Sequence, residues 1–173
     1  MNAAVIQQIN AATADEAAAV FRKCCGSAWW CEQMTEARPF ADADAVTTAA
    51  DAAFDQMPRE AWLEAFAAHP QIGDLQSLRM KYAGNREWSA GEQSGAAGAD
   101  EETLKRLAAG NAAYLQRFGY IFIVCATGKT AAEMLALLEA RLDNAPEAEL
   151  PIAAAEQRKI THLRLAKLSD SSN

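Results

Sequence analysis

The pattern Ser/Thr-x-x-Glu, followed by amphipathic sequence, constrains the fold more than any other feature of the chain. It begins at Thr13, at Ser89 and at Thr130. In this pattern the hydroxyl accepts a hydrogen bond from a backbone amide of the first helical turn, and the glutamate accepts one from the amide of the capping residue. Each occurrence therefore predicts the start of a helix. Gly26 fits the end of the helix that begins at Thr13, and Gly119 fits the end of a helix that begins at Asp100.

Alanine is frequent, whereas the chain has only 9 glycines and 5 prolines. Alanine favours helices more than any other residue, and glycine and proline favour them least. The sequence therefore predicts an all-α fold, a compact single-domain bundle of about seven to nine helices. We expect one domain over residues 1–173, with a flexible tail at 169–173. The expected helices include 43–56, 58–68, 75–82, 100–118 and a last helix that begins near Pro151.

The net charge of −7 narrows the range of partners. An acidic chain repels phosphate backbones, and the sequence has no Lys/Arg cluster with interleaved aromatic residues, so we expect no nucleic-acid binding. The amino terminus lacks the basic and apolar regions of a secretory signal. The longest apolar run, 120–126, is too short to span a membrane, and we expect it to be an extended or kinked helical core segment. These features predict a soluble, cytoplasmic protein.

The four cysteines are Cys24, Cys25, Cys31 and Cys125. They lack the Cys-x-x-Cys spacing of zinc and redox sites, and neither histidine lies near them in sequence. Disulfides are rare in cytosolic proteins. We therefore expect reduced structural thiols and no metal site. A thiol-based redox protein that uses the first three cysteines stays an alternative.

Two ionisable residues fall on apolar helix faces. His69 follows Trp62 and Phe66 at helical spacing, and Pro70 ends that helix. Arg164 stands between apolar residues at intervals of four in the last helix. Each residue also has a structural interpretation, as a core histidine and as an arginine that snorkels or pairs with a buried acid. Glu92 likewise fits a helix cap.

Several motifs, taken in order along nearly the whole chain, resemble one known family. They are Cys25-Gly26-Ser27-x-Trp29, Arg38-Pro39-Phe40, His69-Pro70-Gln71-Ile72-Gly73, Ser89-x-x-Glu92-Gln93, Asn111-x-x-Tyr114-x-x-x-Phe118-Gly119-Tyr120-x-Phe122-Ile123, Glu133-Met134-Leu135 and Lys159-Ile160-Thr161-x-Leu163-Arg164-Leu165. This pattern resembles the family of 2-oxo-4-hydroxy-4-carboxy-5-ureidoimidazoline (OHCU) decarboxylases, which form (S)-allantoin in urate breakdown.

The resemblance implies an all-helical, cofactor-free homodimer that acts on a small anionic heterocycle. It implies that His69, Glu92 and Arg164 line the active site. It also implies substrate contacts from Pro70, Ser89 and Gln93 and from backbone amides of Gly119, Tyr120, Ile121, Phe122 and Ile123. Some members of the family end in a peroxisomal tripeptide. Here Ala166-Lys167-Leu168 is internal, which favours the cytoplasm because such a signal is read only at the terminus.

The implied chemistry suits these residue types. The substrate carboxylate sits on a carbon that bears a hydroxyl beside a C=N bond, and this bond can accept the electrons that decarboxylation releases. Arg164 would hold oxygens of the substrate through its fork of donors. His69 would accept the hydroxyl proton or deliver a proton to the ring, and Glu92 would orient His69 or accept ureido N–H groups. A helical interaction module, in which His69 and Arg164 are structural and the tryptophans form a docking surface, is a second alternative.

Overall fold

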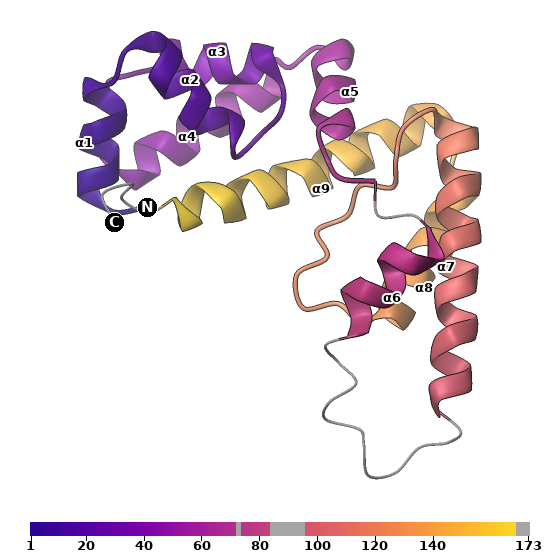
Figure 1. The fold of residues 1–173 in the computed structure, drawn as a ribbon. Coiled ribbons are helices and arrows are strands. Elements are labelled where there is room, and N and C mark those ends of the chain that lie inside the picture. Colours follow the sequence, from indigo (N-terminus) through magenta and orange to yellow (C-terminus); the bar gives the residue numbers. More distant parts are fainter. Residues whose placement is uncertain (72–73, 84–95, 169–173) are drawn as a thin grey trace. The chain divides into compact units, whose positions relative to one another are not determined.

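The fold is all-α in the part of the chain that the structure describes. This computed structural model describes residues 1–71, 74–83 and 96–168, with only the backbone of 96–100. Within these ranges lie nine helices and no strand, which confirms the predicted fold class. The helices are α1 (Ala3–Ala11), α2 (Ala14–Arg22), α3 (Ala28–Glu36), α4 (Ala43–Asp55), α5 (Arg59–Ala67), α6 (Leu75–Ala83), α7 (Ala96–Phe118), α8 (Ala131–Leu142) and α9 (Pro146–Lys167) (Figure 1).

The helices belong to two compact units. The first unit comprises Met1–His69, Ile123–Cys125 and Ala154–Asn173, and the second comprises Pro70–Phe122 and Ala126–Ala153. Helix α9 contributes its first residues to the second unit and the rest to the first. The expectation of one domain over residues 1–173 stays a prediction.

The first unit is built around aromatic side chains from consecutive helices. Helix α3 packs against α2, α4 and α5. Trp30 and Phe54 stack with ring centroids 5.3 Å apart, and Phe54 stacks in the same way on Trp62. Phe21 meets the edge of Trp30 at 6.1 Å. Offset and edge-to-face pairs of this kind add to the free energy gained by burying the rings.

Helix starts in the first unit follow the capping rules. The predicted capping box at Thr13 is present, with hydrogen bonds in both directions between Thr13 and Glu16. Ser27 and Asp42 cap α3 and α4 through their side chains. Asn2 caps α1, a helix that the sequence analysis did not predict.

In the second unit, α7 packs along α8 and α6 packs against α7. The predicted capping box at Thr130 is present at the start of α8. Gly119 ends α7 with a φ of 78°, a conformation that side chains rarely adopt, and its amide donates to the Leu115 carbonyl. The box predicted at Ser89 lies outside the described residues.

Two local predictions are wrong, and the structure decides a third that was left open. Gly26 does not end α2, because that helix stops at Arg22 with Lys23 as its cap. Residues 121–126 are not helical, which decides between the two alternatives left open for them. Pro151 does not start the last helix but lies inside α9, which begins at Pro146. Among the described helices, none combines the length and the apolar character needed to cross a membrane.

Candidate active site

His69 lies just beyond the end of α5. Ala68 caps this helix, and the amide of His69 donates to the carbonyl of Phe66 at 3.2 Å. The imidazole is half-buried, and its Nε2 lies 2.6 Å from Oε1 of Gln157 on α9. The short turn before Pro70 thus fixes the backbone of His69, while α9 holds its ring.

Gly26 determines how closely the segment after α2 approaches this helix end. A Cβ atom placed on Gly26 would lie 2.1 Å from Cβ of Ala68, the residue before His69. Two carbon atoms cannot come so near, so only glycine fits at this point. Gly26 therefore allows the segment after α2 to pack closely against Ala68. This role explains why a glycine stands there although it does not end a helix.

The environment of His69 favours the neutral imidazole. Burial lowers the pKa of His69 below its ordinary value, and the positive charge of Arg164 acts in the same direction. The hydrogen bond with Gln157 opposes both effects without reversing them. His69 is therefore a proton acceptor at neutral pH, before any substrate is bound.

Arg164 lies on α9, half-buried, in the same unit as His69. Its Nη1 donates to the carbonyl of Cys24 at 3.2 Å, just past the end of α2. Within the described residues no carboxylate forms an ion pair with Arg164. The guanidinium carries more donors than this one carbonyl uses, so it can still bind an anion.

Two polar residues of this site, Gln157 and Thr161, are not among the site residues expected from the sequence. Both are fully buried on α9, in a row at intervals of four with Ala153 and Leu165. Gln157 donates through Nε2 to Oγ1 of Thr161 at 3.1 Å. The spacing of four places these residues on one helix face. Two of them are polar, so the face does not show the apolar pattern of a buried stripe.

The remaining residues that the resemblance implied are distributed as follows. Pro70 is exposed, and Gly119 is exposed at the end of α7. Tyr120 and Ile123 are buried, while Ile121 and Phe122 are partly buried. Ser89, Glu92 and Gln93 lie outside the described residues. The structure therefore places two of the three expected catalytic residues, His69 and Arg164, in one unit, where the charge of Arg164 lowers the pKa of His69.

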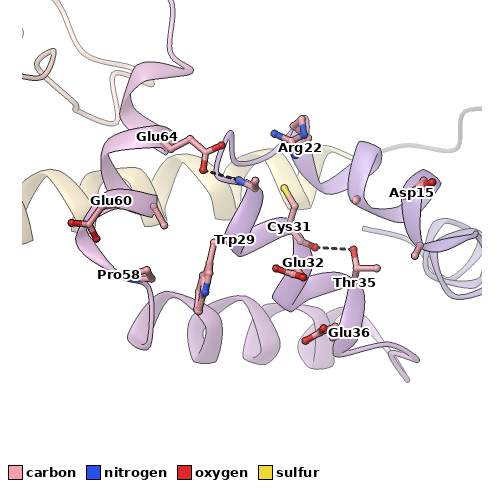
Figure 2. Close-up of a pocket in the computed structure, with 14 residues that line it drawn as sticks. Asp15, Arg22, Trp29, Cys31, Glu32, Thr35, Glu36, Pro58, Glu60 and Glu64 are labelled. Carbon is pink, nitrogen blue, oxygen red and sulfur yellow. Dashed lines mark hydrogen bonds between the residues drawn. The ribbon is translucent and has the colours of Figure 1, made fainter.

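A surface groove of about 770 Å³ lies elsewhere in the first unit, between α2, α3 and α5. Figure 2 shows its rim of carboxylates with Trp29 among them. The acidic lining residues are Asp15, Glu32, Glu36, Glu60 and Glu64. Arg22 is the basic residue among those that line it. An anionic substrate would be repelled by this groove, so the groove does not compete with His69 and Arg164 as a site for one.

The thiols of Cys24, Cys25 and Cys31 are buried. Burial raises the pKa of Cys24 and of Cys25 to about 11 and that of Cys31 to about 12. The thiolate is the reactive form of cysteine, so these values disfavour the redox alternative. In the described part of the chain, no group of three or more His, Cys, Asp or Glu side chains is arranged to hold a metal ion.

Comparison with known proteins identifies the family. A sequence profile described as OHCU decarboxylase matches residues 10–166. The chain is 46% identical over 149 residues to the uric acid degradation bifunctional protein TTL of Arabidopsis thaliana, covering 86% of this chain. It spans only 46% of the length of that protein.

Two further relatives are matched over most of their length. The chain is 34% identical over 133 residues to the 2-oxo-4-hydroxy-4-carboxy-5-ureidoimidazoline decarboxylase of Mus musculus, covering 76% of this chain and 73% of the mouse protein. A crystal structure of an OHCU decarboxylase in the presence of (S)-allantoin is 42% identical, with a TM-score of 0.66, and the match covers 85% of this chain and 94% of that one. The chain belongs to the OHCU decarboxylase family.

Proposed function

We propose that this chain decarboxylates 2-oxo-4-hydroxy-4-carboxy-5-ureidoimidazoline to (S)-allantoin in urate degradation. One observation carries the proposal: in a member of this family, a half-buried histidine bonds to Gln157 of α9, and the same helix carries an arginine that has no carboxylate partner within the described residues and whose charge lowers the pKa of the histidine. A neutral base in the field of a cation that keeps free donors among the described residues suits an anionic substrate that must lose carbon dioxide and relocate a proton.

Arg164 binds the substrate through its remaining donors. The guanidinium presents them in a planar fork that matches a carboxylate or two neighbouring carbonyl oxygens. Its partial burial strengthens this attraction relative to a fully hydrated surface arginine. The contact with the Cys24 carbonyl keeps one Nη group in place, so less side-chain freedom is lost when substrate binds.

His69 moves one proton within the substrate. When the C–C bond to the carboxylate breaks, its electron pair forms a C=C bond to the carbon that bears the ureido group, the electrons of the C=N bond move to the ring nitrogen, and this nitrogen takes up one proton from solvent water. The hydroxyl proton passes to the neutral imidazole of His69, which then delivers it to the carbon that bears the ureido group. This path balances charge and atoms, and delivery from one face yields one enantiomer of allantoin.

The other expected residues keep the roles that the family resemblance implies. Glu92 orients His69 or accepts ureido N–H groups, while Ser89, Gln93 and Pro70 contact the substrate. The backbone amides of Gly119, Tyr120, Ile121, Phe122 and Ile123 donate to its polar atoms. Single substitutions at Glu92, Ser89 and Gln93 test these roles by their effects on KM and kcat.

We also propose that the protein is a homodimer and acts in the cytoplasm without a cofactor. The dimer predicts a sedimentation coefficient that corresponds to two copies of the 18.6 kDa chain. Activity of protein that has been treated with a chelator and freed of small molecules tests the independence from cofactors. Fractionation of the source cells tests the location.

A coupled assay tests the activity itself. The unstable substrate is generated from urate in the reaction vessel, the protein is added, and carbon dioxide release is followed together with the circular dichroism of allantoin. We expect faster carbon dioxide release and an excess of (S)-allantoin, both in proportion to protein concentration. Racemic allantoin formed at the background rate would contradict the proposal.

A further inference from the structure

We propose that Gln157 is a positioning residue that fixes the tautomer of His69. Through its hydrogen bond to Gln157, the imidazole keeps a proton on Nε2 and leaves Nδ1 as the atom that exchanges protons with substrate. The tautomer follows from contacts within the chain, and only its catalytic consequence rests on the proposed function.

The orientation of the Gln157 amide carries the inference. Its amino group donates to Oγ1 of Thr161 at 3.1 Å, one helical turn further along α9. The carbonyl oxygen of the same amide therefore faces His69, and it lies 2.6 Å from Nε2. An amide oxygen can only accept, so Nε2 must carry the hydrogen. In a neutral imidazole Nδ1 then holds the lone pair.

The hydrogen-bonded series from His69 through Gln157 to Thr161 is rigid because the two groups that support the imidazole are buried. Gln157 and Thr161 both have an exposed fraction of 0%. Thr161 also interacts with the thiol of Cys25, which is fully buried as well. A glutamine has several rotatable bonds, and bonding at both ends of its amide confines them. The ring of His69 is thus held from the interior, while its other edge is left for substrate.

The charges around His69 reinforce this arrangement. Arg164 on α9 is the charged side chain that acts on the ring within the described residues, and it disfavours a second proton there. The neighbouring thiol of Cys25 stays uncharged because burial raises its pKa to about 11. The resting imidazole is consequently neutral, and the choice between its two tautomers is made by Gln157.

Nitrogen-15 NMR of the imidazoles measures the tautomer directly. The chain has only two histidines, so the signals of His69 can be assigned by their loss in His69→Asn. At pH 7.5 we expect a protonated Nε2 and an unprotonated Nδ1 in the unmodified protein. In Gln157→Leu the two nitrogen shifts should move toward each other, as both tautomers become populated. A protonated Nδ1 in the unmodified protein, or unchanged shifts in Gln157→Leu, would overturn the inference.

A matched control separates this effect from a general loss of structure. Gln7 is exposed on α1, so Gln7→Leu makes the same chemical change away from His69. We expect unchanged His69 shifts in this variant. His162, which bonds to Asp51 at 2.8 Å, serves as an internal reference in every sample. Movement of the His162 signals in Gln157→Leu to the same extent as those of His69 would mark a global change and count against the inference.

Gln157→Glu keeps the shape of the side chain and supplies a second readout. A carboxylate beside Nε2 favours the imidazolium, so the pKa of His69 rises. The acidic limb of the pH–rate profile should move to higher pH by about one unit or more. In Gln157→Leu, kcat should fall about 10- to 100-fold, as for other residues that orient a histidine, with KM changed less because Arg164 is intact. If the acidic limb of the pH–rate profile does not move in Gln157→Glu, the inference is overturned.

The two proposals can fail separately. If the unmodified protein shows the Nε2–H tautomer but does not turn over OHCU, the positioning role stands and the proposed function fails. If it turns over OHCU but carries its proton on Nδ1, the proposed function stands and the role of Gln157 fails.

Discussion

Two polar clusters, one in each unit, differ in how completely their groups are satisfied within the chain. In the second unit, Glu149 is fully buried and accepts from Arg141 Nε at 2.7 Å and from Asn144 Nδ2 at 2.6 Å. It also accepts from the hydroxyl of Tyr114. In the first unit, Arg164 is half-buried and, among the described residues, bonds to a single backbone carbonyl. We call the Glu149 cluster of the second unit the closed cluster, because its groups bond to one another. We call the Arg164 cluster of the first unit the open cluster, because Arg164 keeps donors for a ligand.

This difference indicates that the closed cluster stabilises the fold and that the open cluster can bind a ligand. Charges that are buried and mutually paired have no capacity left for a ligand, and removal of either partner exposes the other to a large desolvation cost. An arginine with spare donors contributes little to folding but can attract an anion. Substitutions in the closed cluster should therefore lower stability, and substitutions in the open cluster should lower turnover.

The largest expected effect is that of His69→Asn on turnover. Asparagine retains a polar side chain but cannot take up a proton at neutral pH, so kcat should fall about 100- to 10,000-fold. The coupled assay on protein with an unchanged circular dichroism spectrum measures this loss. A folded variant with a nearly normal rate would remove His69 from the mechanism.

Glu149→Ala should break the closed cluster. The substitution removes the carboxylate that pairs with the buried cation of Arg141, and the free energy of unfolding should fall by about 3–5 kcal/mol. Glu139→Ala is the matched control, because it removes a carboxylate from the exposed ion pair with Arg106 and should cost about 1 kcal/mol or less. Urea unfolding measures both. Equal losses in the two variants would mean that the closed cluster has no special role in stability.

Arg164→Lys should separate charge from geometry in the open cluster. Lysine keeps the positive charge but lacks the planar fork, so kcat/KM should fall about 10- to 100-fold. The free energy of unfolding should change by about 1 kcal/mol or less, because within the described residues Arg164 has no ion pair to lose. A large loss of stability with normal turnover would assign Arg164 a structural role instead.

Gly26→Ala should have the smallest effect of the four, and a second substitution should reverse it. The added Cβ would overlap that of Ala68 and force the backbone before His69 to shift, at a cost of about 1–3 kcal/mol. Gly26→Ala combined with Ala68→Gly removes the overlapping atom and should recover much of the stability and activity. If the double variant is no better than Gly26→Ala, the contact at Ala68 does not account for the glycine.

Features that depend on a few neighbouring residues could be predicted from the sequence. The capping boxes at Thr13 and Thr130 formed as expected, since both partners of each bond lie within one helical turn. The helix end at Gly119 was predicted for the same reason. Gly26 was misassigned because its partner, Ala68, is distant in sequence and only the fold brings the two together.

The candidate site was less predictable because its partners are distant in sequence and polar. In the sequence Arg164 stands between apolar residues at intervals of four, Ile160 and Leu168, but all three are only partly buried and lie beside the buried row rather than within it. That row includes Gln157, whose contact with His69 joins residues 88 positions apart. Hydropathy does not reveal a buried glutamine, because its burial is favourable only once its hydrogen-bond partners are in place.

The side-chain Nε–Hε NMR signals of Arg164 and Arg141 test the contrast between the open and the closed cluster most directly. The signals, assigned with Arg164→Lys, are followed while (S)-allantoin is added up to concentrations that inhibit turnover. We predict that the Arg164 signal shifts in a saturable way while the Arg141 signal stays in place. A stationary Arg164 signal at inhibitory concentrations, or a shift of Arg141 alone, would contradict the assignment of the open cluster as the binding site.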